Sequence, residues 1–148
     1  MAYAALITWF TTILAGLYML TVWLIENDVT DRSAGASRLP APVIFSHLLL
    51  AVTGFGVWAA YLILDRPMLA WAAVFVLGLI VLLGLAMFAR WIPVYREPVA
   101  PAAAQVLPAA PPSPPEGAFP LAVVVSHGLL ATSTAVLVLL TALGIGGS

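Results

Sequence analysis

Four long apolar segments dominate the pattern of hydrophobic and polar positions along the chain, and polar or proline-containing segments separate them. A helix needs about 20 apolar residues to cross about 30 Å of hydrocarbon, because each residue adds 1.5 Å. The sequence therefore predicts an all-α integral membrane protein with four transmembrane helices. These spans are expected at about residues 4–25, from 40 or 42 to 64, 68–89 and 119–143.

The segments between the spans predict how the helices are connected. Asp65, Arg66 and Pro67 leave room only for a minimal turn, so the second and third spans should form a tight antiparallel hairpin. The third span is expected to close before Pro93. Residues 97–118 are rich in Pro and Ala and predict an extended loop outside the membrane. A single domain over residues 1–148, arranged as an up-down four-helix bundle, fits these connections.

Composition supports a membrane protein and excludes several function classes. Of the 148 residues, 64% are hydrophobic and 7% are charged, against roughly a quarter charged in soluble domains. The net charge of −1 provides no basic surface for nucleic acid, and the absence of cysteine removes thiolate chemistry. No nucleotide-binding glycine loop or hydrolase motif occurs. A stand-alone enzyme is therefore less expected than an electron-transfer or accessory subunit.

The arginines predict the orientation in the membrane. Arg32, Arg38, Arg90 and Arg96 lie in or beside the first and third loops, whereas the second loop has only Arg66. Because short cytoplasmic loops are enriched in basic residues, we expect these two loops in the cytoplasm and both termini outside. All five basic residues are arginine, which favours a bacterial inner membrane. The first span is expected to remain in the mature protein, because no basic segment or cleavage site accompanies it.

The second and fourth spans begin with similar sequences. Residues 40–51 read PAPVIFSHLLLA and residues 120–131 read PLAVVVSHGLLA, so proline, Ser-His and Leu-Leu-Ala coincide without a gap. A fainter similarity joins the first and third spans, in which Trp9, Gly16, Leu17 and Leu20 match Trp71, Gly78, Leu79 and Leu82. These matches predict a duplicated two-helix unit, with repeats at about residues 4–64 and 68–144, both inserted in the same sense.

The repeat places the chain's two histidines at the same depth. His47 and His127 each lie about 10 Å into the membrane from the arginine-rich side. The second and fourth helices are diagonal in an up-down bundle, so the two imidazoles are expected to face each other across its axis. Ionisable residues inside a membrane are functional candidates by default. Two opposed neutral imidazoles are the axial ligands that a haem b requires, with the haem iron as the metal.

The residues around the histidines are expected to serve the same site. Small residues follow each histidine on its own helical face and would leave room for a macrocycle; they are Ala51, Gly54, Ala131 and Thr134. Arg90, then Arg38 and less directly Arg32, are candidates to pair with the haem propionates. Ser46 and Ser126 precede the histidines and are expected to bond backbone carbonyls or help fix the imidazole tautomer.

The architecture resembles small four-helix membrane cytochromes b in outline, which implies an electron carrier or a haem-bearing anchor subunit. Such a protein needs a partner, either another membrane or redox subunit or a quinone. The histidines also fit other interpretations: a structural pair in a cofactor-free accessory or assembly subunit, a small transporter or channel, or a metal or proton site. The tryptophans lie mostly near the span ends and are expected to anchor the helices at the lipid interface.

Overall fold

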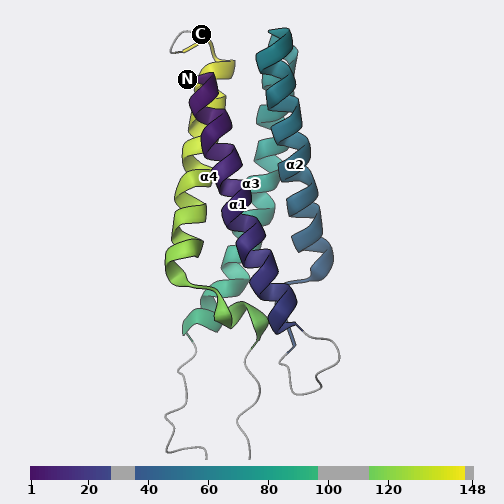
Figure 1. The fold of residues 1–148 in the computed structure, drawn as a ribbon, viewed down its shortest axis with the longest axis vertical. Coiled ribbons are helices and arrows are strands. Elements are labelled where there is room, and N and C mark those ends of the chain that lie inside the picture. Colours follow the sequence, from purple (N-terminus) through teal and green to yellow (C-terminus); the bar gives the residue numbers. More distant parts are fainter. Residues whose placement is uncertain (28–35, 97–113, 146–148) are drawn as a thin grey trace, which may run out of the picture.

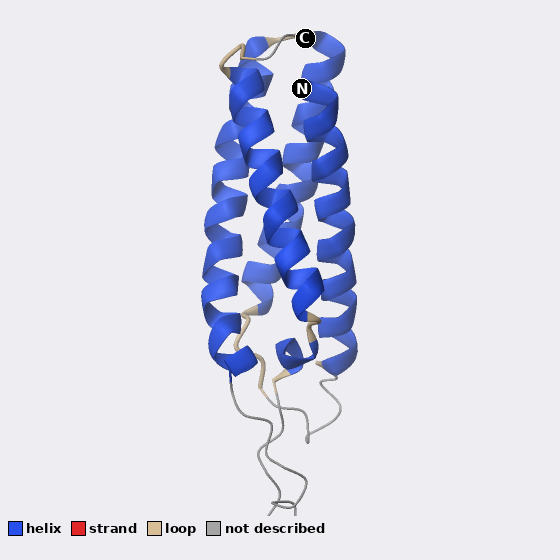
Figure 2. Cartoon of the chain, turned by 90° about the vertical axis from the view of Figure 1, so that its left-hand side faces the viewer, coloured by secondary structure: helices blue, strands red, loops and turns tan. Residues whose placement is uncertain are grey.

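The computed structural model describes residues 1–27, 36–96 and 114–145. Within these ranges all regular elements are helical: α1 (Ala2–Glu26), α2 (Ala41–Leu64), α3 (Pro67–Arg96), the short 3-10 helix η2 (Pro115–Ala118) and α4 (Leu121–Ala142). The four α-helices lie side by side along one axis, and both ends of the chain lie at the same end of the molecule (Figures 1 and 2). Each of the four is long and apolar enough to cross a membrane, so the expected all-α fold with four candidate spans is confirmed.

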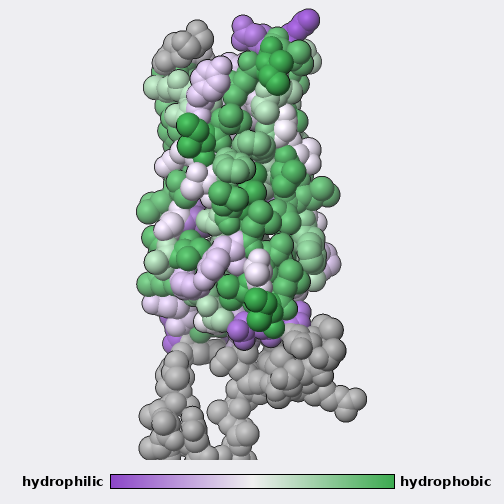
Figure 3. Space-filling model, in the orientation of Figure 1, coloured by the Kyte–Doolittle hydropathy of each residue, from purple (hydrophilic) through white to green (hydrophobic). Residues whose placement is uncertain are grey.

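The exterior of the helices is apolar along most of its length. Figure 3 shows hydrophobic residues covering the visible face, with hydrophilic residues gathered near the two ends. Large apolar side chains such as Ile7, Phe75 and Leu129 are about two-thirds exposed. Apolar surface on this scale is unfavourable in water and favourable in hydrocarbon. The four helices therefore suggest a multi-pass membrane protein.

The helices form a ring of neighbours. Helix α1 packs most extensively on α4, and α2 on α3, while the contacts of α1 with α2 and of α3 with α4 complete the ring. Among the described elements, no two Cα atoms of α2 and α4 lie within 8 Å, so these helices lie diagonally. Only Asp65 and Arg66 connect α2 to α3, as the sequence predicts. Asp65 adopts a left-handed conformation with φ of 47°, which aspartate tolerates better than most residues, and its N–H donates to the carbonyl of Tyr61.

Small residues let the helices approach closely in the core. Ala5, Ala70 and Ala73 are almost completely buried. A Cβ atom at Gly54 in α2 would lie 2.8 Å from Cζ2 of Trp9 in α1, so the indole occupies the space that a side chain would need. Close contact of this kind is a main source of helix association in a membrane, where the hydrophobic effect does not distinguish a neighbouring helix from lipid.

Most of the tryptophans face inward, contrary to the expectation of lipid anchors. Of the five, only Trp71 is exposed, at 48%, whereas Trp9, Trp23, Trp58 and Trp91 are buried. A buried indole N–H needs an acceptor. Trp23 donates to the Ser37 hydroxyl at 3.0 Å, Trp58 to the carbonyl of Ala2 at 3.1 Å, and Trp91 to the carbonyl of Glu116 at 3.1 Å. These bonds tie the helices to the segments at the bundle ends.

Helix α3 is longer than the sequence suggests. It continues through Pro93 to Arg96, so the expectation that it closes before Pro93 is wrong. Proline removes one hydrogen bond of the helix, to the carbonyl four residues earlier, without forcing the helix to end. Trp91 and Val94 are buried on either side of Pro93, and their packing holds the last turn in place.

A buried carboxyl group joins two segments at one end of the bundle. Glu116 lies in η2, which packs against α1 and α3, and its side chain is fully buried. It accepts hydrogen bonds from the Ser37 hydroxyl at 2.9 Å and the Arg38 main-chain N–H at 2.6 Å. The segments that precede α2 and α4 are thus fastened to each other. Residues 97–113 of the expected Pro/Ala loop lie outside the described residues.

Replacing Glu116 by Ala should lower the free energy of unfolding by about 1–3 kcal/mol, because the Ser37 hydroxyl and the Arg38 N–H would lose their buried acceptor. The measurement is thermal or denaturant unfolding in detergent micelles. Glu26→Ala is the matched control, since Glu26 is exposed at the end of α1. Equal stability of the two variants would contradict this role of Glu116.

Two glycines on α2 should respond oppositely to alanine. Gly54→Ala is expected to destabilise the protein by about 1–3 kcal/mol, because the new methyl group collides with Trp9 and Val76. Gly56→Ala meets no atom within 4 Å and should be neutral or stabilising by up to about 1 kcal/mol, since alanine favours helix. Unfolding of both variants under identical conditions tests the difference. A Gly54→Ala protein as stable as Gly56→Ala would show that Trp9 does not occupy this position.

Candidate functional site

The two histidines stand at equivalent places on α2 and α4. Both helices begin after a proline, Pro40 and Pro120, and both prolines have φ of −63° and ψ of 126°. In each case the proline carbonyl accepts the first main-chain N–H groups of the helix. His47 and His127 lie two turns further on, so the local structure presents both imidazoles at the same depth and on the same side of the helix.

The structure brings the two imidazoles together between the diagonal helices. Their ring centroids lie 6.3 Å apart, and the ring planes are inclined at 51°. The Cα atoms of the two helices stay more than 8 Å apart, so the histidine side chains bridge the interior of the bundle. The sequence repeat predicts this convergence of His47 and His127.

A main-chain carbonyl orients His127. Its Nδ1 lies 3.0 Å from the carbonyl oxygen of Thr12 in α1. A carbonyl only accepts, so Nδ1 carries the hydrogen and the lone pair is on Nε2. The imidazole of His47 lies near the main chain of Ile80 in α3. Its Nδ1 is enclosed and forms no hydrogen bond with a described residue.

Each imidazole also lies edge-on against a glycine of the neighbouring helix. A Cβ atom at Gly16 in α1 would be 3.2 Å from Cε1 of His127, and one at Gly84 in α3 would be 3.3 Å from Cε1 of His47. These distances are shorter than most carbon contacts, so a larger residue would push the ring away. The two histidines thus have similar surroundings. Each lies against a glycine and near the main chain of one neighbouring helix, which is α1 for His127 and α3 for His47.

The contacts of the two histidines pair Gly16 with Gly84 and not with Gly78. The expected partner of Gly16 was Gly78, but Gly78 has no neighbour within 4 Å of a Cβ position, and Gly84 is the residue in the equivalent contact. In this register GLYMLTVW (residues 16–23) matches GLAMFARW (residues 84–91) at Gly, Leu, Met and Trp. This motif was a signal that sequence reasoning missed, because alignment on Trp9 and Trp71 pairs a buried residue with an exposed one.

The small residues beyond the histidines do not leave the open space that the sequence suggests. Trp9 fills the position beside Gly54. Thr134 is buried, and its hydroxyl forms a hydrogen bond of 2.9 Å with the hydroxyl of Thr8. Protein atoms therefore fill the interior about two turns beyond the histidines. A planar group bound between the imidazoles would therefore have to lie at the depth of the two rings, or between the rings and the end of the bundle where η2 packs.

Of the arginines proposed for the propionates, the described contacts of Arg90 do not reach the imidazoles. Arg90 is exposed, and its guanidinium makes a long contact of 3.4 Å with the carbonyl of Ala86 in its own helix. The main-chain N–H of Arg38 binds Glu116, which places that residue at the end of the bundle. Arg32 lies outside the described residues.

The serines beside the histidines have a local role. Ser126 donates to the carbonyl of Ala122 one turn earlier, at 2.5 Å, as expected. Ser46 is exposed, and no hydrogen bond joins either hydroxyl to an imidazole within the described residues. The tautomer of His127 is set by Thr12 in another helix and not by its neighbouring serine.

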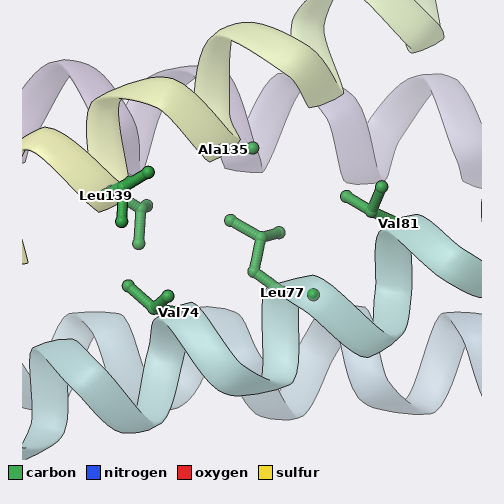
Figure 4. A pocket seen from close by; sticks show the side chains of 7 residues that line it. Val74, Leu77, Val81, Ala135 and Leu139 are labelled. Atoms are coloured by element: carbon green, nitrogen blue, oxygen red, sulfur yellow. The ribbon is translucent and has the colours of Figure 1, made fainter.

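Two cavities lie outside the histidine pair. The first cavity, of about 260 Å³, lies between α3 and α4. It is lined by apolar side chains, which include Val74, Leu77, Val81, Ala135 and Leu139 (Figure 4). The other is a groove of about 380 Å³ between α1 and α4. We call it the α1/α4 groove; its walls include Thr11, Ala15, Tyr18, Ala122, Ser126 and Leu130.

The arrangement brings two imidazole rings close enough to bind one group between the helices. Within the described ranges, no three His, Cys, Asp or Glu side chains gather as a metal cluster. Comparison of the chain with protein-family models, with curated proteins and with solved structures gave no match. Interpretation of the site therefore depends on its geometry.

The contacts of His127 predict its tautomer. In protein labelled with ¹⁵N-histidine, one imidazole should show a protonated Nδ1 and an unprotonated Nε2, because the carbonyl of Thr12 accepts from Nδ1. Gly16→Ala should change this signal, since the methyl group would displace the ring by a few tenths of an ångström. Gly128→Ala, next to His127 but with free space around it, is the control. The opposite tautomer in the unmodified protein would show that the bond to Thr12 is absent.

Proposed function

We propose that this chain is a small membrane electron carrier or haem-bearing anchor subunit, with one haem b held between His47 and His127. The separation of the two rings carries the proposal. Two iron–imidazole bonds of about 2 Å place the ligating nitrogens about 4 Å apart and the ring centres, each about 1 Å further out, about 6 Å apart. The observed distance between the centroids is 6.3 Å.

The surroundings of the rings suit axial ligands. Haem ligation by histidine uses one ring nitrogen while the other is oriented by a hydrogen-bond acceptor. The carbonyl of Thr12 takes this role for His127, and the main chain of Ile80 lies near the imidazole of His47. A buried ring nitrogen without a hydrogen bond is unfavourable. The enclosed Nδ1 of His47 forms no hydrogen bond with a described residue, and Nε2 of the same ring would be the nitrogen that holds the haem.

When bound, haem b would supply reversible one-electron chemistry. The chain's own residues would hold the macrocycle and keep water away from it. Gly16 and Gly84 set the position of the imidazole edges, and Trp9 closes the interior on the side away from η2. The partner that gives or takes the electron would be a redox subunit or a quinone.

The duplicated two-helix unit and the up-down arrangement belong to the same proposal. The repeats at residues 40–51 and 120–131, together with those at 16–23 and 84–91, support duplication. The contacts agree, because α1 packs on α4 as α3 packs on α2. The excess of arginine in or beside the first and third loops supports a bacterial inner membrane location with both termini outside the cytoplasm.

One observation favours a second function, that of a cofactor-free accessory subunit. The bond between His127 and Thr12 joins α4 to α1 without any ligand, and interhelical hydrogen bonds of this kind stabilise helix packing in membranes. In that case the histidines would be structural. The two functions differ in whether the purified protein carries haem.

Expression of the full chain in a host supplied with haem precursor, followed by purification in detergent, tests the proposal. The protein should show a Soret band that shifts on reduction, about one haem per chain, and the low-spin spectrum of two nitrogen ligands. His47→Ala and His127→Ala should each lose the low-spin spectrum, because each removes one axial ligand. Haem content, absorbance and electron paramagnetic resonance are the measurements.

Ser46→Ala is the matched control, since Ser46 adjoins His47 but is exposed and should leave the spectrum unchanged. Size-exclusion chromatography and circular dichroism establish that the histidine variants are folded. A folded, colourless protein in the presence of excess haem would overturn the cytochrome proposal and favour the accessory subunit.

A further inference from the structure

We infer that the α1/α4 groove binds the ring of a membrane quinone, with the isoprenoid tail in the surrounding lipid. The inference deepens the proposed function and rests on it for the role of the ligand, since it names the redox partner of the histidine site. The binding itself depends only on the groove. It is carried by three hydroxyl groups on an otherwise apolar, lipid-facing surface: those of Thr11, Tyr18 and Ser126.

The three hydroxyls supply both donors and acceptors. Thr11 donates to the carbonyl of Ile7 at 2.8 Å and Ser126 to that of Ala122 at 2.5 Å, so both hydroxyl oxygens keep lone pairs that can accept. The side chain of Tyr18 is half exposed, and its hydroxyl forms no hydrogen bond with a described residue. Its O–H can donate to a quinone carbonyl. The threonine and serine oxygens can accept from the hydroxyls of the reduced quinol.

The depth of the groove selects a quinone over a phospholipid. Tyr18 lies a little over two turns, about 12 Å, before the end of α1 at Glu26, and helical side chains lean toward the helix N-terminus, here further into the membrane. An acyl chain at that depth has no polar atom for an unpaired hydroxyl, and hydrocarbon cannot satisfy one. A quinone ring carries carbonyl groups into the hydrocarbon region.

The groove and the histidine site lie on opposite sides of the contact between α1 and α4. Ser126 immediately precedes His127 in α4, and Thr11 immediately precedes Thr12, whose carbonyl binds that histidine. The same contact between α1 and α4 therefore holds the imidazole on its inner side and forms the groove on its outer side. A quinone ring bound in the groove would lie next to His127, one of the two proposed haem ligands.

The corresponding surface on α2 and α3 lacks the hydroxyls of α1. In the register that matches Gly16 with Gly84, the positions of Thr11, Ala15 and Tyr18 correspond to Leu79, Leu83 and Ala86. Packing of these two helix pairs therefore does not require hydroxyls or a small residue at 15. The α1/α4 pair has these hydroxyl groups and the α2/α3 pair lacks those of α1, as expected for a site that takes a single ligand.

The space suits a ring of this size. The groove measures about 380 Å³, within the range of about 300–1,000 Å³ that is typical of small-molecule sites. Ala15 and Ala122 leave this space between the helices. Ala15→Leu would fill it with the residue that occupies position 83 on the other half, so the helix should tolerate the change.

Titration of the full chain in phospholipid nanodiscs with ubiquinone-1, a short-tailed benzoquinone, tests the inference through quenching of tryptophan fluorescence and through calorimetry. Binding should be saturable. Tyr18→Phe should weaken it about five- to tenfold, as expected for the loss of one hydrogen bond, and Ala15→Leu should abolish it. Tyr95→Phe and Ser46→Ala, on other exposed surfaces, should leave the affinity unchanged.

The same titration of His47→Ala protein separates this inference from the haem proposal. Saturable binding that is sensitive to Tyr18→Phe supports the groove even if the unmodified protein carries no haem. Linear partitioning that is equal in all variants overturns the quinone site, and it does so even if the Soret band is present. Saturable binding that Ala15→Leu and Tyr18→Phe leave unchanged would place the quinone elsewhere and likewise overturn the inference.

Discussion

The edge-on contact between each histidine and a glycine of the neighbouring helix is the constraint on which the rest of the site depends. Gly16 and Gly84 let the imidazoles approach the backbones of α1 and α3, and the carbonyl of Thr12 faces Nδ1 of His127. That carbonyl turns Nε2 of His127 away from α1. Both glycine contacts lie between the most extensively packed helix pairs, α1 with α4 and α2 with α3. The separation of 6.3 Å between the rings is the result of two matching half-sites.

Hydrogen bonds at one end of the bundle keep the two histidines at the same depth. Trp23 and Trp91, equivalent residues of α1 and α3, donate to the segments that lead into α2 and α4. Glu116 joins those two segments to each other. Because each histidine follows its helix start by the same two turns, fastening the starts fixes the depth of both imidazoles. The polar cluster at this end of the bundle thus contributes to the alignment of the rings.

The two halves of the bundle share the histidine contacts but differ around them. Trp9 fills the space beside Gly54, whereas Leu77, at the equivalent position of α3, lines an apolar cavity on the α4 side. Hydroxyl groups gather on the outer surface of α1 and α4, and leucines occupy the matching surface of α3. Matching histidine contacts combined with different surroundings would suit the proposed site, with one ligand approached from one side.

Hydropathy alone was sufficient to predict the four helices, and the repeated Ser-His motif was sufficient to predict that His47 and His127 lie at one depth. Both are local properties, because span length and position along a helix do not depend on neighbours. The inward-facing tryptophans, the partners Thr12 and Gly84, and the buried Glu116 were decided only by the tertiary structure. In a membrane, lipid-facing and helix-facing surfaces are both apolar, so no periodic pattern distinguishes them. Which face of a helix meets which neighbour is therefore settled by shape and by hydrogen-bond partners that are distant in the sequence.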